Sequence, residues 1–185
     1  MIDDVLSEMH KEMEKTADSL DQEFKKMRTG RASVSLVDGI KCECYGTKMR
    51  LNQIATISIP ESRLLTIQPW DQSVIGEIEK SILKSGLGLT PMNDGKIIRI
   101  SLPPLTEERR KELAKMAKKM AEETKIVIRN HRREANETLK ELKKESEISE
   151  DEMYLYQDKV QKVTDEFIEK IDEIRKEKER EILEF

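Results

Sequence analysis

The feature of this sequence that most limits its fold is a long stretch without glycine or proline, from Thr106 to Lys144. A helix over this stretch would be roughly 58 Å long, which exceeds the width of a small domain. Apolar or small residues recur along it every three or four positions, the spacing of one helix face. These residues are Leu113, Met116, Met120, Thr124, Val127, His131, Ala135, Thr138 and Leu142. We therefore predict a rod that needs other helices along its length.

The opposite face of this predicted helix is basic. With His131 at the centre of the apolar stripe, Arg129 and Arg133 point away from it, and Arg132 and Asn136 flank them. Three lysines join the same side: Lys118, Lys125 and Lys140. The planar guanidinium of arginine is well suited to binding phosphate. A charge run on a helix is more often a solvated face, so the spacing alone indicates only a cluster of positive charge.

Two further long helices are predicted, one on each side of the central helix. Over residues 2–28, apolar residues recur at heptad spacing, which favours packing in a left-handed bundle; they are Leu6, Met9, Met13, Ala17, Leu20, Phe24 and Met27. Near the other end, Ser149 and Glu152 have the spacing of a capping box. The apolar face of the helix that follows comprises Met153, Val160, Val163, Phe167, Ile171, Ile174 and Ile182. We predict an up-down-up three-helix bundle.

Residues 31–104 follow a different pattern, with most of the glycines and all of the prolines of the chain. Short β-branched runs at 40–45, 54–59, 63–70 and 96–102 predict strands, and residues 73–84 have helical spacing. The predicted fold class is α+β, in which a long three-helix bundle (domain I, 1–30 and 105–185) carries an inserted small, β-rich α/β domain (domain II, 31–104). Two chain crossings would join the domains, and we expect hinge residues there: Gly30, Pro103, Pro104 and Leu105.

The composition restricts the possible classes of protein. Charged residues make up 39% of the chain and aromatic residues only 4%, which suits narrow helical seams better than a broad globular core. No apolar run is long enough for a membrane span, and the acidic N-terminus is unlike a signal peptide, so we expect a cytoplasmic protein. The formal net charge is -4, but basic residues predominate in 105–148 and acidic residues in 149–185. Such polarity favours a partner of fixed geometry.

The sequence gives no positive indication of catalysis. Cys42 and Cys44 are expected to be ordinary strand thiols, with a metal pair as the alternative. Trp70 is expected to pack in the core or at a domain interface. His10 falls in the first helix, and His131 is expected to pack within the stripe. We therefore predict a protein that is not an enzyme, with no catalytic site, no metal and no cofactor.

Four short segments, in this order and spacing, resemble the ribosome recycling factor family, and the resemblance extends over the whole chain. They are Arg28-Thr29-Gly30-Arg31-Ala32-Ser33, residues 102–110 (Leu-Pro-Pro-Leu-Thr-Glu-Glu-Arg-Arg), residues 129–136 (Arg-Asn-His-Arg-Arg-Glu-Ala-Asn) and residues 147–152 (Glu-Ile-Ser-Glu-Asp-Glu). The resemblance implies an L-shaped, two-domain protein with roughly the outline of transfer RNA. It also implies binding to the post-termination ribosome, against large-subunit ribosomal RNA near the central intersubunit bridge. With elongation factor G, which hydrolyses GTP, such a factor splits the ribosome into subunits and releases mRNA and tRNA.

Carried over by residue, the resemblance makes Arg132 the first candidate for a contact with ribosomal RNA, beside Arg129, Arg133 and Asn136. Arg28 and Arg31 are further candidates, with a role in helix capping or in the hinge as the alternative.

This sequence departs from the family's usual pattern at two of its positions. Val34 stands where the family usually has proline, and His131 stands where it usually has an apolar residue. We expect a monomer. The alternative function is a coiled-coil adaptor or scaffold, which would self-associate stably, and an enzyme with a cleft between its domains is a further alternative.

Overall fold

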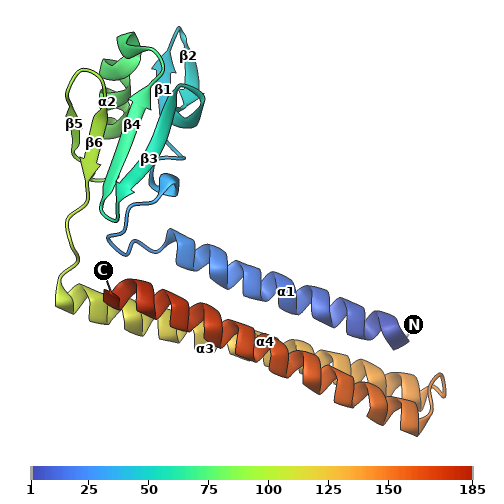
Figure 1. Cartoon of the computed structure of the whole chain (residues 1–185). Coiled ribbons are helices and arrows are strands. Elements are labelled where there is room, and N and C mark those ends of the chain that lie inside the picture. The colour runs from blue at the N-terminus through green and yellow to red at the C-terminus, as the bar shows by residue number, and fades with distance from the viewer. Residues whose placement is uncertain (1, 185) are drawn as a thin grey trace. The chain divides into compact units, whose positions relative to one another are not determined.

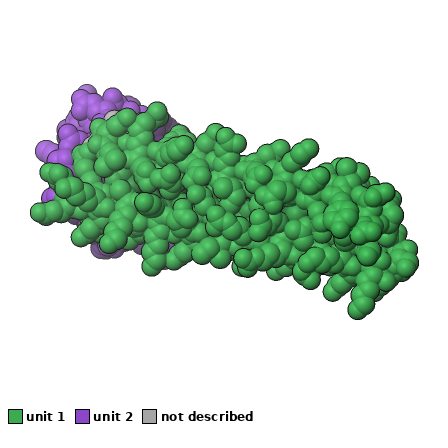
Figure 2. All heavy atoms as spheres, turned by 90° about the horizontal axis from the view of Figure 1, so that it is seen from below, with its two compact units in different colours: residues 1–28, 107–184 green, residues 29–106, 185 purple. Residues whose placement is uncertain are grey.

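A computed structural model of the chain describes residues 2–184, which form two compact units. Unit 1 comprises the residues up to Arg28 together with Glu107–Glu184, and unit 2 comprises Thr29–Thr106 (Figure 2). The predicted domain limits at residues 1 and 185 lie outside the described residues.

Within residues 2–184, unit 1 is a three-helix bundle of α1 (Ile2–Lys26), α3 (Glu107–Lys144) and α4 (Glu150–Glu184) (Figure 1). Residues in contact show that α3 and α4 are antiparallel, because Arg110 Nη1 donates to the Leu183 carbonyl oxygen (3.1 Å) and Lys125 Nζ lies 2.7 Å from Asp172 Oδ1. In α1, Asp3 accepts a hydrogen bond from the Tyr156 hydroxyl of α4, and His10 contacts Phe167 of α4, so α1 and α4 run in the same direction. The predicted up-down-up order is confirmed.

The apolar faces predicted for the outer helices are largely confirmed. Heptad spacing turns the same side of each helix inward, and α1 buries Met9, Met13, Ala17, Leu20 and Phe24. In α4 the buried face comprises Met153, Val160, Thr164, Phe167, Ile171, Lys178 and Ile182. The predicted Val163 and Ile174 lie beside this face and are half-buried.

The prediction for α3 is right for Leu113, Ala135 and Leu142, which are buried, and wrong for part of the stripe between them. The buried face comprises Leu113, Ala117, Ala121, Lys125, Ile128, Ala135, Leu139 and Leu142, so it is rotated away from the predicted stripe by about one residue. Met116 and Val127, expected inside, are 46% and 41% exposed. The reason is that α3 packs against two helices at once. Ala117 and Ala121 lie on the buried face, whereas Met120, Thr124 and Val127 border the open groove between α1 and α3.

Local hydrogen bonds explain where the helices of unit 1 end. After α3, Glu147 N–H donates to the Leu142 carbonyl (2.9 Å) and Ser146 N–H to the Lys143 carbonyl (3.0 Å), which is a Schellman ending. Ser146 holds the left-handed conformation (φ 61°) that glycine usually supplies there. The predicted capping box then starts α4.

The capping box is reciprocal. Ser149 N–H donates to Glu152 Oε2 (2.7 Å), and Glu152 N–H donates to Ser149 Oγ (3.2 Å). These hydrogen bonds lower the pKa of the Glu152 carboxyl below its usual value, the bond from the Ser149 backbone being the largest cause.

Unit 2 contains a hairpin of β1 (Lys41–Cys44) and β2 (Thr47–Arg50) and a four-stranded antiparallel sheet in the order β3-β4-β6-β5. The strands of this sheet are β3 (Ala55–Glu61), β4 (Leu64–Pro69), β5 (Pro91–Asn93) and β6 (Ile98–Ser101). Helix α2 (Ile75–Lys84) contributes Ile78 and Ile82 to a core shared with the strands. The predicted α+β class is confirmed.

Trp70 corrects one expectation about unit 2, because its side chain is 67% exposed instead of packed in a core. The indole Nε1–H donates to Thr56 Oγ1 (2.9 Å) on the neighbouring strand. Trp70 directly follows β4, whose alternation ends at the buried Pro69, so the next side chain faces solvent.

Candidate nucleic-acid interface

The arginines predicted to bind RNA lie on the side of α3 next to α4. Ile128 and Ala135 face the bundle interior and are buried, which places Arg129 and Arg133, one turn apart, in solvent. Arg132 lies seven residues after Lys125, and therefore two turns along the same helix side. It is half-buried at the seam between α3 and α4.

Arg132 is held by a neutral acceptor. Its Nη1–H donates to Gln161 Oε1 of α4 (3.3 Å), and the Gln161 amide Nε2–H donates in turn to Asp165 Oδ1 (2.8 Å). Within residues 2–184, none of Arg129, Arg132 and Arg133 forms an ion pair. Carboxylates of the part of the chain that the structure describes therefore do not neutralise these guanidinium groups.

Asn136 lies on the same side, one turn beyond Arg132, and is half-buried. Among the described residues, its Oδ1 is a buried side-chain oxygen without a hydrogen-bond partner. A buried carbonyl oxygen without a donor costs free energy, and because Oδ1 is buried it is not itself presented on the surface where the arginines lie.

The lysines predicted on this face differ from one another. Lys118 is exposed, and Lys140 is exposed and paired with Glu137 (2.9 Å). The prediction is wrong for Lys125, whose side chain is only 11% exposed and lies 2.7 Å from Asp172 Oδ1 and 3.2 Å from Glu122 Oε1. Because the inward face of α3 is rotated, Lys125 points into the α3–α4 seam, where it can hold two carboxylates and not a nucleic acid.

The electrostatics of this pair follow from its geometry. The hydrogen bond that the Lys125 ammonium donates to Asp172 is the largest cause that raises the pKa of Lys125 above its usual value. The same contact lowers the pKa of the Asp172 carboxyl. Both groups are therefore charged over a wide range of pH around neutrality.

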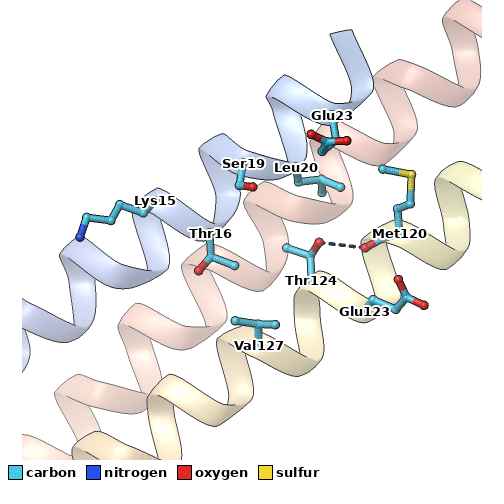
Figure 3. A pocket seen from close by; sticks show the side chains of 9 residues that line it. All are labelled: Lys15, Thr16, Ser19, Leu20, Glu23, Met120, Glu123, Thr124 and Val127. Atoms are coloured by element: carbon cyan, nitrogen blue, oxygen red, sulfur yellow. Dashed lines mark hydrogen bonds between the residues drawn. The ribbon is translucent and has the colours of Figure 1, made fainter. Parts of the chain in front are cut away.

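Toward α1, the predicted apolar stripe lines an open groove of about 440 Å³ (Figure 3). Met120, Thr124 and Val127 of α3 border it, opposite Thr16, Leu20 and other residues of α1. The Thr124 hydroxyl does not point a free donor into the groove, because it donates to the Met120 carbonyl (2.8 Å).

His131 packs at the α1–α3 contact, as its position in the stripe predicts. Its side chain is 20% exposed, with Nε2 3.3 Å from Thr16 Oγ1 and Nδ1 3.5 Å from Glu134 Oε2. The ring therefore makes contacts inside the bundle, and it does not join the arginines on the other side of α3.

The residues predicted as a hinge occur at the two ends of unit 2. Gly30 has a left-handed backbone (φ 78°), and a Cβ at this position would lie 3.2 Å from Leu105 Cγ and 3.6 Å from the Pro103 carbonyl oxygen. A side chain is therefore disfavoured at Gly30 both by conformation and by space. Helix α1 ends at Lys26, so Gly30 follows the helix at a distance and is not its capping residue.

Arg28 and Arg31, on either side of this glycine, are both exposed, and each makes an interaction inside the chain. Thr29 is only 4% exposed. Its position in a short polar segment does not predict that it is buried. Pro103 and Pro104 are exposed. Val34 lies in a short 3₁₀ turn, Val34–Leu36, capped by the Ser33 hydroxyl, which accepts from Ser35 N–H (3.3 Å).

The described residues offer little for other chemistry. Cys42 and Cys44 are free and buried, and burial is the main cause that raises the pKa of the Cys44 thiol to about 12. Among the described residues, no three His, Cys, Asp or Glu side chains are grouped so that they could hold a metal ion. None of the helices between residues 2 and 184 combines the length and apolar character that crossing a bilayer requires.

Known proteins resemble this chain over its whole length. The family model described as "Ribosome recycling factor" matches residues 20–183. The ribosome-recycling factor of Syntrophobacter fumaroxidans is 60% identical over 184 residues, covering 100% of both chains, and that of Syntrophus aciditrophicus is 58% identical with the same coverage.

Solved structures agree with the sequence comparison. A solution structure of ribosome recycling factor has 42% identity and a TM-score of 0.78, with 100% of this chain and 98% of the other covered. A second structure describes the Thermus thermophilus (T. thermophilus) factor and Escherichia coli (E. coli) elongation factor G bound to the E. coli post-termination complex. Its similarity is 45% identity and a TM-score of 0.64, with 99% of each chain covered.

Proposed function

The chain belongs to the ribosome recycling factor family, and we propose that it recycles the post-termination ribosome together with elongation factor G. In this reaction GTP hydrolysis by the elongation factor drives separation of the subunits, and mRNA and tRNA are released. The chain itself is not an enzyme. It acts as a monomer in the cytoplasm, docked against large-subunit ribosomal RNA near the central intersubunit bridge.

The observation that carries this function is similarity over the whole length of the chain, including both units, to proteins with that one name. Similarity confined to the helices would have been compatible with an adaptor that shares only the bundle. The partners follow from the related structure in which a recycling factor and elongation factor G share a post-termination complex.

The proposed RNA-binding residues are Arg132, Arg129, Arg133 and Asn136 of α3. Their support is geometric, because two of the arginines are exposed, none of the three forms an ion pair within residues 2–184, and Asn136 lies one turn beyond Arg132 on the same side of α3. Phosphate contacts from arginine fix the orientation of a protein on nucleic acid and make binding depend on salt. We propose that these contacts dock the bundle in one orientation.

The test of this surface is Arg132→Ala, with Lys11→Ala, at an exposed lysine of α1, as the matched control. Both substitutions remove one positive charge from a helix of the bundle and keep a good helix former. Loss of a charged hydrogen bond to phosphate should weaken binding to large subunits by roughly tenfold and flatten its salt dependence. The control should bind like the parent, as measured by cosedimentation over a range of salt. Normal binding by Arg132→Ala would show that this face does not dock.

We also propose the domain limits 1–30 with 105–185 and 31–104, with a hinge at Gly30, Pro103, Pro104 and Leu105. Arg28 and Arg31 could contact RNA beside it or serve its structure, and binding by Arg28→Ala and Arg31→Ala variants separates the two roles.

For the hinge, the test is Gly30→Ala, with Gly39→Ala as control because a Cβ at Gly39 meets nothing within 4 Å. An alanine at Gly30 would strain the left-handed backbone of this crossing, and the variant should preserve ribosome binding and slow subunit splitting in a light-scattering assay. Unchanged splitting would remove the hinge from the mechanism.

A further inference from the structure

Gln161 of α4 links the proposed RNA-binding arginine to a carboxylate. The Gln161 side chain is exposed, and its amide accepts from Arg132 Nη1–H at 3.3 Å while it donates to Asp165 Oδ1 at 2.8 Å. Arg132 belongs to α3 and Gln161 to α4, so this hydrogen bond joins two helices. The two residues are 29 positions apart in the sequence. It is the contact through which α4 reaches the proposed interface.

The chemistry of each group fixes the direction of this chain of hydrogen bonds. An ionised carboxylate only accepts and a guanidinium only donates, whereas a primary amide has one end of each kind. With Asp165 one helical turn beyond Gln161, the amide nitrogen must face Asp165, and its oxygen must then face Arg132. Without Asp165 the amide could turn over and present its own N–H groups to the guanidinium.

A neutral acceptor suits an arginine that must also bind phosphate. The guanidinium has five N–H donors, and one hydrogen bond to Gln161 leaves the others available for a phosphate group. A carboxylate in the same place would form an ion pair with Arg132 and repel the phosphate. The amide orients the side chain before binding, which reduces the side-chain entropy lost on docking.

From this geometry we propose that Gln161 is a positioning residue, which holds Arg132 oriented for its contact with ribosomal RNA, and that Asp165 sets the orientation of the Gln161 amide. This inference rests on the proposed function, since it requires Arg132 to bind RNA. Through Gln161, helix α4 also contributes to the interface. Its contribution is indirect, because Gln161 acts through Arg132 and need not touch the RNA itself.

The experiment measures binding of the full chain to large ribosomal subunits. Gln161→Met keeps the length of the side chain and removes the amide, and it should weaken binding about fivefold, the effect of one lost hydrogen bond. Gln161→Glu should weaken binding by roughly tenfold or more, because it adds repulsion to phosphate. The matched controls are Gln22→Met and Gln22→Glu, the same substitutions at an exposed position of α1, and both should bind like the parent.

A double-mutant cycle separates positioning from a general structural effect. In an Arg132→Ala background, Gln161→Met should cause no further loss of affinity. The inference is overturned if Gln161→Met binds as tightly as the parent, or if it weakens binding equally in both backgrounds. If Arg132→Ala alone binds normally, the proposed docking surface fails first. Loss with Arg132→Ala but none with Gln161→Met refutes only the role of Gln161.

Discussion

Replacing Lys125 by methionine tests whether a charged pair stabilises the α3–α4 seam. Lys125 Nζ lies 2.7 Å from Asp172 Oδ1, with the two side chains 11% and 31% exposed. Methionine keeps most of the apolar stem, so the main change is an Asp172 carboxylate without its principal partner. Removing one partner of a fully buried pair costs about 3–5 kcal/mol. Asp172 is partly exposed to water, and Arg175 Nε lies 3.6 Å from its Oδ1. We therefore expect Lys125→Met to lower the free energy of unfolding by about 2 kcal/mol, less than for a fully buried pair.

The pH dependence of this effect has a definite sign. The pKa of Asp172 is lowered in the folded state, so its contribution is present above the pKa of the unfolded chain, near 3.9, and is lost as the pH falls through the lower folded value. The pKa of Lys125 is raised, so its contribution is present below about pH 10 and is lost above the raised value. The difference in stability between parent and Lys125→Met should therefore be constant near neutrality and decrease in acid.

Urea unfolding followed by far-UV circular dichroism measures the change, because most of the helix belongs to unit 1. Fluorescence of Trp70, which lies in unit 2, provides a second probe that should shift less. Lys118→Met is the matched control, an exposed lysine of the same helix, and it should change stability by less than about 0.5 kcal/mol. The double variant Lys125→Met/Asp172→Leu should recover most of the loss. An unchanged urea midpoint for Lys125→Met would refute the argument that this pair stabilises the bundle.

Three smaller predictions concern local features. Ser146→Gly should stabilise the chain by about 1 kcal/mol in the same urea assay, because Ser146 has a left-handed backbone (φ 61°) that glycine adopts without strain; a destabilised variant would contradict the assigned helix ending. Ser149→Ala should cost about 1 kcal/mol through loss of the cap on α4, and an NMR titration should find the pKa of Glu152 below its usual value in the parent but closer to that value in the variant. The fluorescence of Trp70, 67% exposed, should be readily quenched by acrylamide in the native state, and a blue-shifted, protected emission would place the indole in a core instead.

The features predictable from the sequence are those decided within one or two helical turns. The capping box at Ser149 needs only residues within the first turn of α4, and the heptad faces of α1 and α4 depend on a single spacing. The arginine group of α3 is likewise local, because Arg129, Arg132 and Arg133 lie within five positions. The strands missed by sequence reasoning, β2 and β5, have weak local signals: β2 contains Thr-Lys-Met-Arg, and β5 is three residues long and begins with proline.

The features that sequence reasoning missed depend on contacts between distant segments. Helical spacing places Lys125 on the basic surface, where a charged residue is expected to meet solvent, whereas its burial depends on Asp172 of another helix. The role proposed for Gln161 depends on the register of α4 against α3, and no spacing within α4 indicates it. Ser146 ends α3 in a conformation that sequence rules assign to glycine.

The ion pair in the seam also has a consequence for how such a chain can change over evolutionary time. Lys125 and Arg132 are two turns apart on α3, and they meet Asp172 and Gln161 of the antiparallel α4. A slip of one heptad between the helices would bring Tyr154 or Ile168 opposite Arg132, and neither offers an amide oxygen. Loss of either Lys125 or Asp172 leaves the other charge unpaired in the seam. Inherited substitutions at these two positions are therefore expected to occur together, although neither residue belongs to the proposed RNA-binding surface.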